Sequence, residues 1–428
     1  MPTQVSRSPR ARWLAGAITV VLAGAVGACS SDSGPTQTGD GVPAGATIEQ
    51  YKAAFADIEP IELNVQVPVP PESPFAKAAT EYTKALAEWS DGKIVPNVSY
   101  ASAVVPYSEM SSAMADGLMD MGDHAPQTDP ATFPFLNAAS QLMLFQDTSP
   151  VVGTLQLVAS WVEFGASSQE LREEYANAGL VPLVPTIPSG AGTMVCTTPV
   201  TSLDSLKGKL MRGAGTSVSK EIAGLGATPV SLPNNEVFDG MQRGTLDCSV
   251  SSLTSLVNNG IFEVGKYWTL HNNALFTAGP SAFAMSKAKW DSLPLVAKQL
   301  IWDRLDVFLE NYLVGNIIGL VKQGFEQVEK YDVEIVDADA DIAQAMAEYR
   351  EGLLAELARG DIGGAPGQEI IDRVKQIHEK WLTIITDLGY DTSIEWRDYD
   401  EWLKANDIDG AAWAAEVRKN ALDPNRPS

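Results

Sequence analysis

The chain has 428 residues, enough for two lobes with sizeable cores, and it carries 54 acidic against 30 basic residues, a formal charge of −24. Such a surface disfavours binding to nucleic acid and to anionic lipid headgroups. The sequence contains no G-x-S-x-G elbow, no G-x-G-x-x-G after a strand and no H-E-x-x-H, and its three histidines are scattered. We therefore expect neither an enzyme nor a cofactor nor a metal site.

Residues 1–28 have the order of a signal peptide. Basic residues come first, and an apolar run of 14 residues follows at 13–26, which is too short for an ordinary membrane span. The run ends in Val26-Gly27-Ala28-Cys29, which resembles the processing site of bacterial lipoproteins. We expect Cys29 to carry the lipid and to become the first mature residue. The alternative is an ordinary secretory signal with a chance cysteine.

Residues 29–58 are predicted to be a lipid anchor and flexible tether, because 30–47 is rich in Ser, Gly, Thr, Pro and Asp without apolar periodicity. Two acyl chains are enough for stable anchoring. We expect an extracytoplasmic protein that is lipid-anchored to the bacterial cell membrane. Removal of 1–28 takes away three arginines and no acid, so the formal charge becomes −27.

A first α/β lobe is predicted to begin near residue 59 and to extend to 186. Strands are expected at 61–69, 94–100 and 118–121, with a helix at 74–90 whose apolar residues recur every three or four positions. A loop at 122–134 follows the third strand and contains Asp123 and His124. Helical pattern then fills 150–178.

The second lobe is predicted at 187–274. Short strands alternate there with helices at 203–207, 217–225 and 236–243, which implies a parallel sheet with right-handed crossovers. Arg212 stands at the end of the strand at 209–211. Because ligands of such sheets bind beyond the carboxyl ends of the strands, Arg212 is where we expect a ligand's anion.

The rest of the chain is predicted to return to both lobes. A single helical pattern covers 294–330, and at 1.5 Å per residue it would be about 55 Å long, so it must bridge the lobes. We assign 275–310 to the first lobe, 311–390 to the second lobe, and 391–428 to a C-terminal helical extension. The predicted fold class is thus α/β, two-lobed, with a long lobe-spanning helix.

The stretch 202–253 resembles the solute-binding proteins of tripartite ATP-independent (TRAP) transporters, dicarboxylate-type family. The resemblance lies in the order of three blocks: Leu206-Lys207-Gly208 with Arg212, then 226–233 (GATPVSLP), then 236–247 (EVFDGMQRGTLD). It covers about residues 60–335 and implies a periplasmic binding protein type II-like fold. It also implies a small organic acid ligand, integral-membrane TRAP permease subunits as partners, and an arginine at position 212 that clamps the ligand carboxylate.

Two departures from the family pattern concern the ligand. Ser251 stands where the family often has asparagine, and 188–198 contains no Lys or Arg where many members have a second cation. A monocarboxylate therefore fits better than a dicarboxylate.

Further candidate ligand-binding residues lie in predicted loops. Ser189 belongs to a loop of small residues (SGAG). This loop either leaves room for a bulky ligand or is a plain flexible turn. Asp123, His124 and Glu72 are predicted at the mouth of the first lobe, and the alternative for them is solvated loop residues.

If Cys29 is lipidated, Cys196 and Cys248 remain as an even pair in an oxidising compartment. We expect a disulfide within the second lobe, with two small buried thiols as the alternative.

Two other functions remain open from the sequence. One is a binding lipoprotein of an ABC-type uptake or sensory system. The other is a cell-surface lipoprotein without a role in transport.

Overall fold

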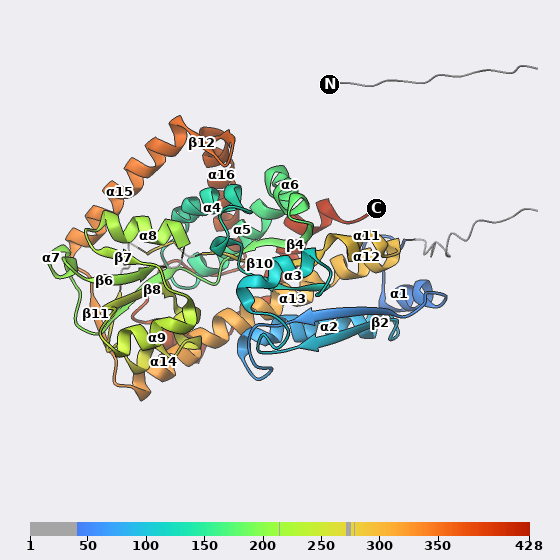
Figure 1. Ribbon diagram of the computed structural model, residues 1–428, viewed down its shortest axis with the longest axis horizontal. Helices are drawn as coiled ribbons and strands as arrows, with labels where there is room; N and C mark the ends of the chain where they lie inside the picture. The colour runs from blue at the N-terminus through green and yellow to red at the C-terminus, as the bar shows by residue number, and fades with distance from the viewer. Residues whose placement is uncertain (1–40, 214, 271–274, 278) are drawn as a thin grey trace, which may run out of the picture. The chain divides into compact units, whose positions relative to one another are not determined.

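The computed structural model describes residues 41–213, 215–270, 275–277 and 279–428. The predicted signal peptide at 1–28 and the predicted lipid attachment at Cys29 lie outside the described residues. Within these residues the chain builds two large sheets, each covered by helices (Figure 1). Two α/β lobes were predicted, and this fold class is confirmed.

The first sheet has five strands in the order β2-β1-β3-β10-β4. Strands β1, β2 and β3 run parallel, whereas β10 is antiparallel to both of its neighbours. The strands are β1 (Ile61–Gln66), β2 (Ile94–Ser99), β3 (Met121–His124), β4 (Leu180–Ile187) and β10 (Ser281–Ser286).

Helices of the first lobe form between these strands. Their apolar faces are buried. In the helix at Lys77–Trp89, for example, Tyr82 and Leu86 are fully buried. The helices are η1 (Pro74–Ala76), α2 (Lys77–Trp89), η2 (Tyr107–Glu109), α3 (Met110–Ala115), η3 (Pro126–Thr128), α4 (Pro134–Ala139), η4 (Ser140–Phe145), α5 (Val152–Ser167) and α6 (Gln169–Asn177).

The second sheet has six strands in the order β11-β9-β5-β8-β6-β7. Strand β6 is parallel to β7 and β8, as predicted, but β5 is antiparallel to β8 and β9, so the sheet is mixed. The strands are β5 (Gly192–Cys196), β6 (Leu210–Gly213), β7 (Thr228–Val230), β8 (Cys248–Ser252), β9 (Tyr267–Leu270) and β11 (Glu334–Asp337).

The three helices predicted in the second lobe are present to within about two residues, and two further short helices were not predicted. Gly208, Gly226 and Gly244 have positive φ and follow three of these helices, as glycine does where a helix must stop. The helices are α7 (Leu203–Leu206), α8 (Gly215–Gly224), α9 (Asn234–Gln242), α10 (Leu253–Asn258) and η5 (Ile261–Glu263).

The long helix predicted over 294–330 is interrupted, so the prediction of one helix is wrong. Arg304 leaves the helical conformation (φ −88, ψ 4), and its guanidinium lies 3.8 Å from the centre of the Trp89 ring. The apolar stripe continues across this break, which is why periodicity does not reveal it. The elements are α11 (Lys287–Ser292), α12 (Leu295–Asp303), α13 (Leu305–Asn311), the π-helical segment η6 (Tyr312–Ile318) and α14 (Gly319–Lys330).

This broken helix still reaches both lobes, because α13 contacts α2 and α14 contacts α10. The chain connects the two sheets at 188–191, between β9 and β10, and along the segment from β10 to β11 that contains η6. These crossings make a hinge motion between the lobes physically reasonable.

The chain after β11 returns along both lobes. Helix α15 contacts α8 beside the second sheet and β12 near α4 (Figure 1). The elements are α15 (Ala340–Arg359), β12 (Asp361–Ile362), β13 (Ala365–Pro366), α16 (Gly367–Asp387), α17 (Tyr399–Ala405), α18 (Gly410–Val417), η7 (Arg418–Leu422) and η8 (Asp423–Asn425).

The predicted tether is too long at its C-terminal end. Helix α1 (Ile48–Phe55) begins at Thr47, whose side chain caps it, and it buries Tyr51 and Phe55 completely. The Tyr51 hydroxyl donates to Asp303 (2.6 Å), and Arg426 from the C-terminal end binds the same carboxylate. The segment 41–58 therefore packs on the folded body, because two aromatic side chains anchor a short helix.

Candidate ligand-binding site

Arg212 lies on β6, at the edge of the second sheet where β6, β7 and β8 all end. Its backbone is in register with Ser249 of β8 and Val230 of β7. Because the three strands are parallel, their carboxyl ends meet at this edge. Arg212 therefore lies at the end of a strand, as predicted.

The Arg212 guanidinium is buried without a counter-charge. Its side chain is 6% exposed; Nε donates to the Leu232 carbonyl (3.2 Å) and Nη2 to Asn234 Oδ1 (2.5 Å). No ion pair joins it to an acid of the described residues. Burial lowers the pKa of Arg212 to about 10, so the group stays charged at neutral pH. A buried cation of this kind is costly unless an anion joins it.

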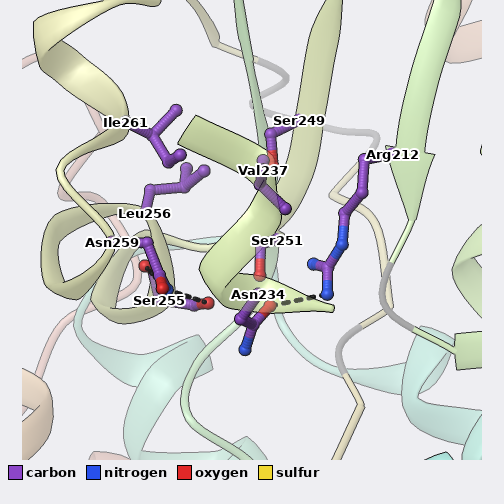
Figure 2. A pocket seen from close by; sticks show the side chains of 9 residues that line it. All are labelled: Arg212, Asn234, Val237, Ser249, Ser251, Ser255, Leu256, Asn259 and Ile261. Carbon is purple, nitrogen blue, oxygen red and sulfur yellow. Dashed lines mark hydrogen bonds between the residues drawn. The ribbon is translucent and has the colours of Figure 1, made fainter. Parts of the chain in front are cut away.

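Arg212 is one of nine residues that line a narrow pocket at this edge of the sheet (Figure 2). Ser249 and Ser251 are two residues apart on β8, so both side chains project from one face of the strand. They are 2% and 6% exposed, and neither hydroxyl has a hydrogen-bond partner in the described part of the chain. These hydroxyls are free to bind a ligand.

The other lining residues come from α9, α10 and the segment after α10. Asn259 follows α10, and its side-chain amide donates to the Ser255 carbonyl (2.7 Å). Asn259 and Ser255 both line the pocket. Apolar side chains complete the wall. The remaining lining residues are Asn234, Val237, Leu256 and Ile261.

The structure brings together only part of the predicted set. Arg212 and Ser251 line the same pocket, whereas Ser189 lies next to it on the 188–191 crossing, with its Oγ 2.8 Å from Ser252 Oγ. Glu72 is exposed in the turn after β1, away from the lining residues. Sequence reasoning missed Ser249, although its two-residue spacing from Ser251 was a usable signal.

Asp123 and His124 were predicted in a loop, and this is wrong. Strand β3 extends through both, because β10 pairs with it in antiparallel fashion, Phe283 opposite Asp123 and Ala282 opposite His124. His124 is fully buried; its Nδ1 lies 2.9 Å from Ser111 Oγ, and burial lowers its pKa to about 3. Neither residue lines the Arg212 pocket.

The structure joins Cys196 of β5 to Cys248 of β8 by a disulfide. The two residues face each other in register, with Cα atoms 4.1 Å apart, and both are fully buried. Cys248 is also in register with Met211, next to Arg212. The bond therefore lies in the sheet that positions the pocket.

Among the described residues, no group of three or more His, Cys, Asp or Glu side chains is placed to hold a metal ion. In the same residues no helix has the length and apolar character needed to span a bilayer.

A two-lobed α/β body with a pocket beside a buried arginine at the strand ends of one lobe is an architecture suited to binding a solute. The family model described as bacterial extracellular solute-binding protein, family 7, matches residues 66–361, well over half of the chain. The chain belongs to this family, the solute-binding proteins of TRAP transporters. The predicted family is confirmed.

Individual relatives are distant. The ectoine-binding periplasmic protein of Halomonas elongata is 25% identical over 219 residues, which is 50% of this chain and 63% of that protein. The solved structure of a TRAP solute-binding protein from Rhodoferax ferrireducens, with benzoate, has a TM-score of 0.64 at 16% identity. It covers 76% of this chain and 99% of its own. A marine metagenome protein with pyroglutamate has a TM-score of 0.59 at 16% identity, covering 74% and 100%.

Proposed function

We propose that this protein binds a small organic acid with one carboxylate between its two lobes and delivers it to a TRAP-type permease from the outer face of the membrane. The observation that carries the proposal is the buried guanidinium of Arg212, which lacks a counter-charge. A guanidinium offers a planar fork of donors that matches a carboxylate. An acid would thus supply the missing negative charge.

The polar lining favours one carboxylate over two. Of the nine described residues that line the pocket, Arg212 alone is basic; the other polar residues are hydroxyls and amides. A second carboxylate would be buried there without a cation, which is costly. A carboxylate with hydroxyl, carbonyl or apolar groups on the remaining atoms suits the lining better.

The two lobes already contact each other. Lys220 of α8 donates to Gln141 of η4 (3.1 Å), a hydrogen bond from the second lobe to the first. Ligand binding would favour the arrangement in which both lobes contact the solute, since a ligand stabilises the state it binds best. The relatives bind ectoine, benzoate and pyroglutamate by name, which supports a small carboxylate for this chain as well.

The proposed lipid anchor rests on the residue order before Cys29 and on the acyl-chain argument alone. Residues 41–58 pack on the folded body, so 30–40 would be the part that links this body to the lipid. This length is sufficient to keep the pocket near a permease in the same membrane.

The experiment is a thermal-shift screen in which each acid is paired with its own neutral amide. Benzoate, pyroglutamate and short hydroxy acids should include compounds that raise the melting temperature, whereas their amides should not. Dicarboxylates should stabilise no better than matched monocarboxylates. Equal stabilisation by acids and amides would show that Arg212 does not hold a carboxylate.

A further inference from the structure

Asp123 is a second buried charge without a partner. Five carboxylates are buried in the described part of the chain: Asp120, Asp123, Glu174, Glu221 and Asp303. Four of them accept hydrogen bonds from other residues; Glu174, for example, accepts from the backbone of Phe135 (2.6 Å) and Leu136 (3.2 Å). Asp123 has a hydrogen bond only to its own backbone amide among these residues.

The asymmetry between these carboxylates indicates a function for Asp123. Burial raises the pKa of Asp123 to about 7, as it does for Glu174 and Glu221, so it is the missing donors and not the pKa that set Asp123 apart. Arg212 is likewise the sole buried Arg or Lys of the described residues. The two uncompensated buried charges are thus of opposite sign, one on each lobe.

Asp123 and Arg212 lie at the ends of the two sheets that the segment 188–191 connects. In the first sheet, Asp123 is opposite Phe283, two residues from Ser281, and Ser281 is opposite Ile187 at the end of β4. In the second sheet, Gly192 at the start of β5 is opposite Ser252, the residue after Ser251. The segment 188–191 connects these two points directly. Asp123 and the Arg212 pocket therefore border the same boundary between the lobes.

Tyr312 links Asp123 to the crossings. Its hydroxyl donates to the Pro188 carbonyl (3.4 Å), and it also bonds Ser281. Burial, and then the charge of Asp123, raise the pKa of Tyr312 and of Tyr107, so both phenols lie near this carboxylate. Tyr107 is half-buried. The charge of Asp123 acts on both phenols, and aromatic rings in the same region could add to the attraction of an organic cation.

We infer that the ligand is a zwitterion whose carboxylate binds Arg212 and whose positively charged nitrogen binds Asp123. The inference rests on the proposed function and adds the chemical class of the solute. It also accounts for uptake by a strongly acidic protein: a surface of this charge repels anions at long range, but it does not repel a solute of zero net charge. A zwitterion would compensate both buried charges at once.

The test uses ligand pairs that differ only in the charged nitrogen. Glycine betaine is paired with tert-butylacetate and proline with cyclopentanecarboxylate, each at millimolar concentration against protein freed of bound solute by unfolding and refolding. We expect at least one zwitterion to stabilise the wild-type protein more than its isostere. Stabilisation by isosteres alone overturns the inference and leaves the proposed function intact. Stabilisation by neither class overturns both.

Calorimetry on Asp123→Asn then tests the residue. Loss of a buried charge pair should weaken the zwitterion by about thirty-fold or more, and should leave the isostere unchanged or tighter. Glu174→Gln is the matched control, because Glu174 is buried with its pKa raised to about 7 but already has backbone donors. Glu174→Gln should change neither the affinity for the zwitterion nor the affinity for the isostere.

The pH dependence of zwitterion affinity distinguishes an ionised Asp123 from a protonated one. If its ionised form holds a cation, the affinity of the zwitterion should fall as the pH is lowered from 8 to 5. Tyr107 and Tyr312, the titratable groups beside it, stay neutral in this range. If Asp123 is instead a protonated donor, Asp123→Asn should bind the zwitterion as well as wild type does, and this result would contradict the inference.

Discussion

Arg212 could be predicted as a site residue because its role depends on local order: a strand, then an arginine, then a helix. Ser251 followed from the same block. Asn234, Ser255 and Asn259 could not be found this way, because α9 and α10 bring them to the pocket only through tertiary packing. Asp123 was assigned to a loop for a similar reason, since its strand partner β10 lies 160 residues later in the chain.

Glu221 on α8 shows what burial does to a carboxylate that has donors. It is 2% exposed and accepts from the Thr277 backbone (3.0 Å) and hydroxyl (2.9 Å), with Arg350 nearby. Burial, the largest cause, still raises its pKa to about 7 from an ordinary value of 4.5. Between these values the unfolded chain has lost the proton and the folded chain keeps it, so the contribution of Glu221 to stability falls as pH rises.

Glu221→Gln should remove this dependence. Relative to wild type, the variant should gain stability between pH 4.5 and 7 by at most about 1.4 kcal/mol per pH unit, and the difference should be constant below pH 4.5. Urea unfolding of both ligand-free proteins at several pH values measures this difference in stability. A stability difference that does not change across this window would mean that Glu221 titrates normally in the folded protein.

At the scale of elements, the alternation of strands and helices over 203–247 was predictable, because glycines and prolines mark each boundary. The break at Arg304 was not; in the structure Arg304 lies over the Trp89 ring and donates to Asp306 (2.9 Å), and the contact with Trp89 is not visible in the local sequence. The antiparallel pairing of β5 was likewise hidden, because pairing direction depends on where the chain enters the sheet and not on strand composition.

The β5–β8 disulfide should be a main support of the second sheet. The bond closes a loop with a sequence separation of 52 residues, and cross-links of this kind typically contribute about 2–4 kcal/mol to the free energy of unfolding. Replacing both Cys196 and Cys248 by serine should lower stability by about this amount in chemical denaturation. Peptide mapping under non-reducing conditions is the control, and two free thiols there would refute the bond.

At the scale of the whole molecule, the sequence predicted two lobes but not how the C-terminal part joins them. The extension at 391–428 is more than a set of short helices: Trp396 Nε1 donates to the Thr148 carbonyl of the first lobe (3.0 Å), and Arg397 binds Asp337 of β11 (2.8 Å). The aromatic residues were visible in the sequence, but nothing local gave their partners, which lie far away in the chain.

The proposed lipid anchor makes a prediction about the intact protein in its bacterium. Cys29→Ala should move the protein from the membrane fraction to the soluble extracytoplasmic fraction, or leave it unprocessed. Ser33→Ala is the control, because it changes a residue close to the predicted attachment site and leaves all three cysteines in place. Normal processing and membrane attachment of the Cys29→Ala protein would remove the lipoprotein proposal while leaving solute binding unaffected.

The most direct test of the account is calorimetry on Arg212→Ala with the tightest-binding acid from the screen. Loss of a buried charge-assisted pair costs about 2–5 kcal/mol, so affinity should fall by roughly thirty-fold or more. Arg212→Lys should restore only part of it, because an ammonium cannot form the fork. Arg243→Ala, an exposed arginine paired with Asp239, should bind like wild type. Wild-type affinity in a folded Arg212→Ala protein would contradict the account.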